Sequence, residues 1–254
     1  MMRMLLSAFA GIILLCAPAH AQFGAEASAS KAGFSFPAAG SIKILVFRPD
    51  VSVGAQSTGG MNEPNAEWTK QARDNLAKAL AAEQAGRANE LVVMPEFEGD
   101  NAALLADYQA LFRNVTNAVV VHKLFKGNRL PTKREDFNWT LGSGVSKLSE
   151  LGGGDYGLFI YTNDSYGSAG RKALQIFGAM MGMGISSGVH TGYAGLVDLH
   201  SGELVWVNAD LKMGGDVREA DGATKRIQQL LEDFPKRAGA TTAAAPATTA
   251  TAAN

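Results

Sequence analysis

Two short apolar runs on either side of an amphipathic segment constrain the fold of this chain most. Residues 42–47 and 91–94 are almost entirely apolar, which is typical of buried strands. Between them, residues 65–87 repeat apolar side chains with a 3.6-residue period, and Asn65 can cap the resulting helix. A strand, a helix and a strand in this order close by a right-handed crossover, so we expect a parallel pair.

The second half predicts an antiparallel hairpin followed by a closing helix. Apolar runs at residues 193–199 and 204–207 flank a turn at Ser201-Gly202. Asp216 precedes Glu219 by three residues, a pattern that caps a helix start, and the helix runs to Phe234. With a central strand at 156–161 and a long helix from residue 104, the sequence predicts one α/β (α+β) domain. We expect a mixed sheet of about five strands with helices mainly on one face.

The beginning of the chain has the order of a secretory signal. A basic start is followed by an apolar run that is shorter than the ~20 residues of a bilayer span, and then by small residues up to Ala21. We expect cleavage between Ala21 and Gln22, and a periplasmic protein with no transmembrane span in its mature form. Acylation of Cys16 is not expected, because Leu15 precedes it where a small residue belongs.

The composition of the two ends of the chain sets the expected domain boundaries. We expect residues 1–21 to form the signal peptide, residues 22–40 a flexible linker, residues 41–236 the folded domain and residues 237–254 a disordered Ala/Thr/Pro tail. Cys16 is the only cysteine, so the mature chain would lack disulfides, thiolate catalysis and cysteine-bound metal. A net charge of -1 provides no basic field for nucleic acid.

Residues that could carry chemistry are scattered along the chain. Glu96 and Glu98 follow one expected strand and Asp164 follows another, at strand ends where open sheets often bind ligands. The glycines around Arg171 and Lys172 follow a strand, but their spacing is not that of a phosphate-binding loop.

Three polar residues of the hairpin share one face, namely His190, Asp198 and His200. Ten residues along a strand span about 30 Å, however, so His190 lies far from the other two. His122, near the end of a helical pattern, has no matching partner. We therefore expect no catalytic residue, metal or cofactor. The alternative is a hydrolytic or metal-dependent enzyme, whose activity would be lost on replacing Asp164, Asp198 or His200.

The segment 173–188 combines methionine, other large apolar residues and glycine. Methionine makes adaptable apolar contacts and glycine permits close approach. One interpretation is a core element packed on the sheet. The other is a partner-binding surface, formed by Phe177, Met180, Met181 and Met183.

The run Tyr193-Ala194-Gly195-Leu196-Val197-Asp198-Leu199, its glycine turn and the strand ending in Trp206 resemble an envelope family. This family includes the amino-terminal domain of the Tol translocation protein, the lipoprotein activators of penicillin-binding proteins and the curli secretion channel subunit. The opening strand, helix and strand and the closing helix extend the resemblance over residues 42–234. It implies a domain that binds protein partners without turning over a substrate, and no functional residue is carried over individually.

These observations favour a non-enzymatic periplasmic binding or adaptor protein of the cell envelope. Its partners would be envelope proteins, and self-association into a homo-oligomer is a further expectation. The first alternative is an oligomeric channel or secretion-assembly component, suggested by the curli subunit and the glycine-rich segment. The second is the enzyme described above.

Overall fold

The computed structural model describes residues 26–37, 42–85, 90–124, 128–186 and 188–237. The predicted signal peptide and residues 238–254 of the predicted tail lie outside them. Within the described residues, nine strands form one mixed sheet. They are β1 (Glu26–Ser30), β2 (Lys43–Val46), β3 (Asp50–Gln56), β4 (Asn62–Pro64), β5 (Glu90–Val93), β6 (Trp139–Thr140), β7 (Tyr156–Gly167), β8 (Val189–Asp198) and β9 (Glu203–Asp210).

Five α-helices accompany the sheet in the described part of the chain. They are α1 (Ala66–Ala85), α2 (Gly99–Val119), α3 (Ser146–Glu150), α4 (Ala169–Met180) and α5 (Ala220–Leu230). A π-helical turn, η1 (Val120–Leu124), continues α2, and two short 3-10 turns, η3 (Pro131–Lys133) and η4 (Ser143–Val145), precede α3. None of the helices in these described ranges is both long and apolar enough to cross a bilayer.

The strands follow the order β1-β9-β8-β7-β2-β5, and β7 is the longest of them. Its first residues pair in parallel with β2, and its remainder pairs in parallel with β3, which follows β2 after Pro49. The parallel pair β2–β5 and the antiparallel pair β8–β9 confirm the predicted crossover and hairpin. Asn65 caps α1 as predicted, because its side chain accepts a hydrogen bond from the Trp68 amide at 2.9 Å.

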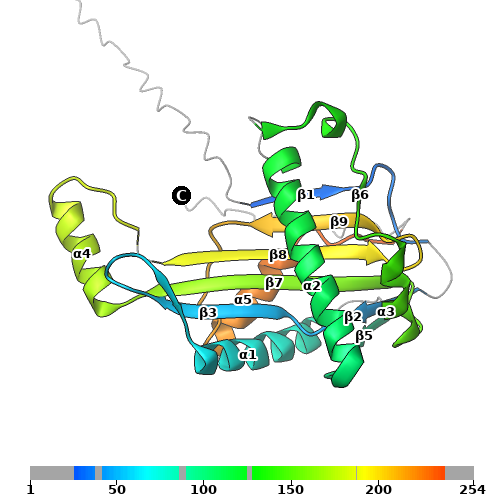
Figure 1. The fold of residues 1–254 in the computed structure, drawn as a ribbon, viewed down its shortest axis with the longest axis horizontal. Helices are drawn as coiled ribbons and strands as arrows, with labels where there is room; N and C mark the ends of the chain where they lie inside the picture. The colour runs from blue at the N-terminus through cyan, green and yellow to red at the C-terminus, as the bar shows by residue number, and fades with distance from the viewer. Residues whose placement is uncertain (1–25, 38–41, 86–89, 125–127, 187, 238–254) are drawn as a thin grey trace, which may run out of the picture.

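Helices cover both faces of the sheet (Figure 1), which corrects the expectation of one covered face. Helices α1 and α5 share one apolar core with Ile44 and Val46, whereas α2 shares a second core with Leu45 and Phe47. Alternate residues of β2 thus enter opposite cores, and a strand buried on both faces reads as a continuous apolar run. The α/β class with a mixed sheet is confirmed. The sheet exceeds five strands because short or polar strands such as β4 and β6 give little apolar signal.

The predicted linker is wrong for residues 26–37, which belong to the fold. Strand β1 pairs with β9 over Glu26–Ser30, and the Phe36 side chain is fully buried against Phe234 and Tyr156. The strand was missed because it lies at the sheet edge and consists of small and polar residues. At the other boundary, Arg237 of the predicted tail bridges to Phe36.

The predicted capping box of the closing helix is also wrong. Helix α5 begins at Ala220, and Glu219 at its N-cap makes no side-chain capping bond. Asp216 instead accepts hydrogen bonds from the backbone amide and the guanidinium of Arg218. The Asp216 carboxylate is therefore engaged by Arg218 and not by the first amides of α5.

Substitution of Gly195 tests the packing of α2 on its face of the sheet. A Cβ atom there would lie 2.5 Å from the Phe112 ring, so Gly195→Ala displaces the ring or bends β8. We expect a loss of about 1–3 kcal/mol in the free energy of unfolding, measured by denaturant titration. Gly184→Ala is the control, since its Cβ would meet nothing within 4 Å, and its stability should stay within about 0.5 kcal/mol of wild type. Equal stability of both variants would contradict the packing described.

Candidate partner-binding surface

Helix α4 projects from one end of the sheet, beyond the paired ends of β7 and β8 (Figure 1). It begins at Ala169 because the Ser168 side chain accepts a hydrogen bond from the Arg171 amide at 3.2 Å. It ends at Met180, and Gly182, with φ of 73°, turns the chain back toward β8. The connection between two central strands thus becomes an arm that leaves the body of the domain.

The side of α4 that faces its own chain is narrow and mostly small or polar. Gly178 is buried there, with Ile185 so close that a Cβ atom on Gly178 would clash. Arg171 donates hydrogen bonds to the backbone carbonyls of Ser186 and Thr58, at 3.0 and 3.3 Å. These contacts attach the arm at its base and cover little apolar surface.

The opposite side of α4 is apolar and faces solvent. At 100° per residue, Ala173, Leu174, Ile176, Phe177, Met180 and Met181 share one side of the helix, which we call the apolar arc. Met180 is 82% exposed, Ile176 65%, Met181 64% and Phe177 61%. Met183, just after the helix, is 58% exposed. The interpretation of this segment as a core element is therefore wrong.

Exposure of the apolar arc to water is energetically unfavourable. Exposed large side chains of about 200 Å² each give a contiguous apolar patch on the order of 600 Å², at the upper limit of what monomeric proteins expose. A 12-residue helix is also marginal without tertiary packing. Both features are typical of surfaces that another molecule covers.

A buried polar cluster holds the strands together at the base of the arm. Asp164 on β7 and Arg226 on α5 are both fully buried, and their side chains form a bidentate ion pair at 2.8 and 2.9 Å. His190 on β8 lies 2.7 Å from the same carboxylate through Nδ1. Burial alone would raise the pKa of Asp164, but the hydrogen bonds from His190 and Arg226 outweigh it and lower this pKa below its usual value.

A cationic side chain lies over two aromatic rings beside this cluster. The Arg218 guanidinium lies 3.8 Å from the centre of the Tyr166 ring and 4.5 Å from that of Trp68. Hydrogen bonds from Arg218 lower the pKa of Asp216 to about 2, and burial raises the pKa of the Tyr166 phenol. These contacts join α1, β7 and the segment before α5.

The structure brings together only some of the polar residues that the sequence singled out. Asp164 and His190 are in contact, but Asp198 and His200 lie at the other end of β8. There, Asp198 accepts hydrogen bonds from the amides of His200 and Ser201 and closes the hairpin turn. Within the described ranges, no three His, Cys, Asp or Glu side chains are grouped closely enough to hold a metal. His122 contacts the Asn128 carbonyl oxygen at 3.2 Å.

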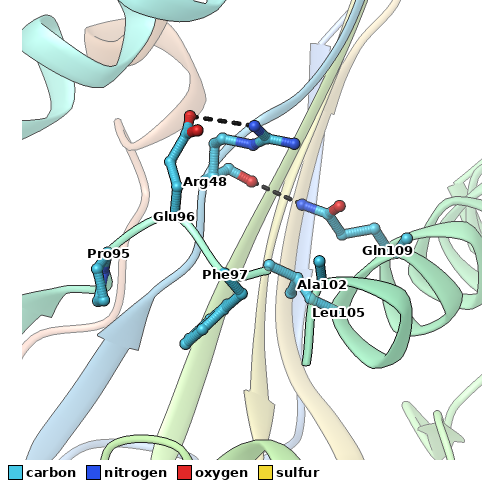
Figure 2. A pocket seen from close by; sticks show the side chains of 8 residues that line it. Arg48, Pro95, Glu96, Phe97, Ala102, Leu105 and Gln109 are labelled. Carbon is cyan, nitrogen blue, oxygen red and sulfur yellow. Dashed lines mark hydrogen bonds and ion pairs between the residues drawn. The ribbon is translucent and has the colours of Figure 1, made fainter. Parts of the chain in front are cut away.

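A small recess lies where β5 leads into α2, near one of the predicted ligand-binding strand ends (Figure 2). Its walls are apolar, formed by Pro95, Phe97, Ala102, Leu105 and Ala106, and it encloses about 40 Å³. On its rim the Arg48 guanidinium donates to Glu96 at 3.0 Å, while Gln109 donates to the Arg48 carbonyl oxygen at 2.6 Å. At about 10–15 Å³ per water molecule, the recess accommodates the end of one side chain.

Comparison with known proteins finds only distant similarity. No protein-family model matches the chain, and no curated protein matches it. Among solved structures, the PelC dodecamer from Paraburkholderia phytofirmans aligns over 84% of this chain and 99% of its own, with a TM-score of 0.37 and 12% identity. A point variant of PelC gives a TM-score of 0.38 and the same identity and coverage. Lipoprotein GNA1162 from Neisseria meningitidis aligns over 66% of this chain and 76% of its own, with a TM-score of 0.26 and 17% identity. Similarity at this level says nothing about the function of this chain.

The buried ion pair predicts a pH-dependent stability. Asp164→Asn leaves the buried charge of Arg226 without its counter-ion, so we expect a loss of about 3–5 kcal/mol at neutral pH. In the wild type the folded-state pKa of Asp164 lies below its unfolded value, so its stabilisation is complete above the unfolded value and is lost as the pH falls through the folded one. Denaturant titrations between pH 7 and pH 2 measure both effects.

Asp198→Asn is the control for this prediction, because Asp198 is partly exposed and closes a surface turn. Its cost should be about 1 kcal/mol. If Asp164→Asn were no more destabilising than Asp198→Asn, the buried ion pair would not have the structural importance described.

Proposed function

We propose that this protein is a non-enzymatic adaptor of the cell envelope, located in the periplasm, that acts through protein–protein contacts made by α4. One observation carries the proposal: the apolar arc of α4 points away from its own domain. In α5, by contrast, Ala223, Ile227 and Leu230 are buried against the sheet. A helix that directs its apolar side outward provides a surface for another molecule.

The residues of the arc suit a protein interface. Phe177, Met180 and Met181 offer large apolar area, and methionine adapts its shape to a partner. Interfaces typically place such side chains at the centre and polar groups at the rim. Here Lys172 borders the arc.

The geometry of the polar residues supports a structural role over a catalytic one. Asp164 and His190 resemble a catalytic acid–base pair. The Asp164 carboxylate, however, already accepts hydrogen bonds from Arg226 and from the Thr162 hydroxyl, the latter at 2.8 Å. The alternative enzyme requires Asp164, Asp198 or His200 to act on a substrate. Asp198 and Asp164 instead hold a turn and a buried cluster in the described structure.

The proposal is tested by substituting two exposed methionines and recovering partners from the native envelope. Met180→Gln with Met181→Gln should leave the melting temperature unchanged in protein dilute enough to be monomeric, because both side chains are mostly exposed, and should abolish crosslinked partners identified by mass spectrometry. Leu111→Gln, at an exposed apolar position on α2, is the matched control and should keep the partners. Unchanged recovery by the double variant, or a fall in its melting temperature, would refute a contact surface on α4.

A further inference from the structure

We propose that the partner covering α4 is a second copy of this chain, which receives the apolar arc at its recess between β5 and α2. This inference rests on the proposed function and specifies its partner. Copies then associate head to tail, each offering α4 to one neighbour and its recess to another. A contact between two different surfaces of this kind is heterologous, and it forms a closed ring or an open filament according to its rotation.

The two surfaces are complementary in charge. Residues 167–188, which include α4, contain Arg171 and Lys172 and no acidic residue. Residues 95–112, which form most of the recess, contain Glu96, Glu98, Asp100 and Asp107 and no Lys or Arg. Arg48 also lines the recess and is paired with Glu96, so the other three carboxylates leave this surface acidic. Opposite charges at the rim of an interface fix its orientation and exclude like-charged pairings. The same distribution disfavours the contact of one α4 with another, since both are basic.

The apolar walls of the recess suit an apolar side chain of the arc. The recess is lined by Phe97, Leu105 and Ala106 among other apolar residues, and it has room for one side-chain end. The arc presents the long, unbranched side chains of Met180 and Met181. The apolar patch of about 600 Å² approaches the roughly 800 Å² that each partner contributes to a stable interface.

Within one copy, the two surfaces do not meet. Helix α4 lies at one end of the molecule, whereas β5 and α2 lie toward the other in the view of Figure 1. The contacts that attach the arm come from Thr58, Ser186 and Ile185, none of which belongs to the recess. Each copy therefore leaves both surfaces available to neighbours.

The decisive experiment mixes two variants of the exported protein and measures mass by sedimentation velocity. One variant carries Met180→Gln and Met181→Gln, and the other carries Ala106→Lys, which places a bulky cation at the recess. Each variant alone should associate at least about tenfold more weakly than wild type, because each lacks one half of the contact. The mixture should form a 1:1 dimer, since one intact recess meets one intact arc, and should grow no further.

A control substitution outside the recess and a charge reversal on α4 complete the test. Ala81→Lys adds the same cation at an exposed position of α1, on the opposite face of the sheet, and it should associate like wild type. Lys172→Glu should weaken association by about fivefold at low salt and by less at high salt. Thermal melting of each variant confirms that it is folded.

Three results would overturn the inference. If the wild-type protein stays monomeric over a 100-fold range of concentration, a second copy is not the partner of α4. Variants that fail to pair in the mixture would exclude the head-to-tail contact. Binding of the wild type, but not the methionine variant, to vesicles of anionic phospholipid without self-association would assign α4 to a membrane surface. If the chain is monomeric while α4 still captures a different envelope protein, this inference fails and the adaptor proposal stands.

Discussion

The pairing of β7 along its whole length determines where everything else in the fold lies. This strand is bordered by β2 and β3 on one side and by β8 on the other, and its apolar residues alternate between the two cores. Leu158 and Ile160 face α1 and α5, while Phe159 stacks on Phe112 of α2. Because β7 and β8 remain paired to Ser165 and Val189, they carry α4 clear of the body.

The buried ion pair between Asp164 and Arg226 stabilises the pairing of β7 and β8 near the ends that lead to α4. Asp164, Arg226 and His190 come from β7, α5 and β8, so one cluster joins three elements at the base of the arm. A buried ion pair contributes little net stability compared with apolar packing, but losing one partner is expensive. The cluster therefore fixes the position of the strand ends from which α4 projects, and the arm itself has little support from its own domain.

Much of the fold could be predicted from the sequence, because its signals are local. The apolar runs of β2 and β5, the period of α1 and the glycine turn of the hairpin each depend on neighbouring residues alone. The second covered face was missed, although the uninterrupted run from Ile44 to Phe47 is the pattern of a strand buried on both sides. Strand β1 could not be found in this way, since an edge strand of alanine and serine is stabilised by its backbone bonds to β9.

The candidate site, too, depends on contacts that local sequence patterns do not reveal. Phe177, Met180, Met181 and Met183 could be selected from composition, but whether they lie in the core or on the surface depends on the direction of α4. That direction is set by the length of the β7–β8 pairing. The contact between Asp164 and His190 depends on strand register, with the two residues directly opposite each other, and the contribution of Arg226 comes from a helix more than sixty residues away.

Hydrogen–deuterium exchange of the α4 amides distinguishes an exposed arm from a helix of the core. We expect fast exchange over residues 169–180 in dilute protein, because the helix has few contacts with its own domain, while β7 and β8 remain protected. The same amides should become strongly protected when the partner that covers the apolar arc is added. If the α4 amides were as protected as those of β7 in dilute protein, and unchanged when partners were added, α4 would be part of the stable core and its role as a contact surface would be contradicted.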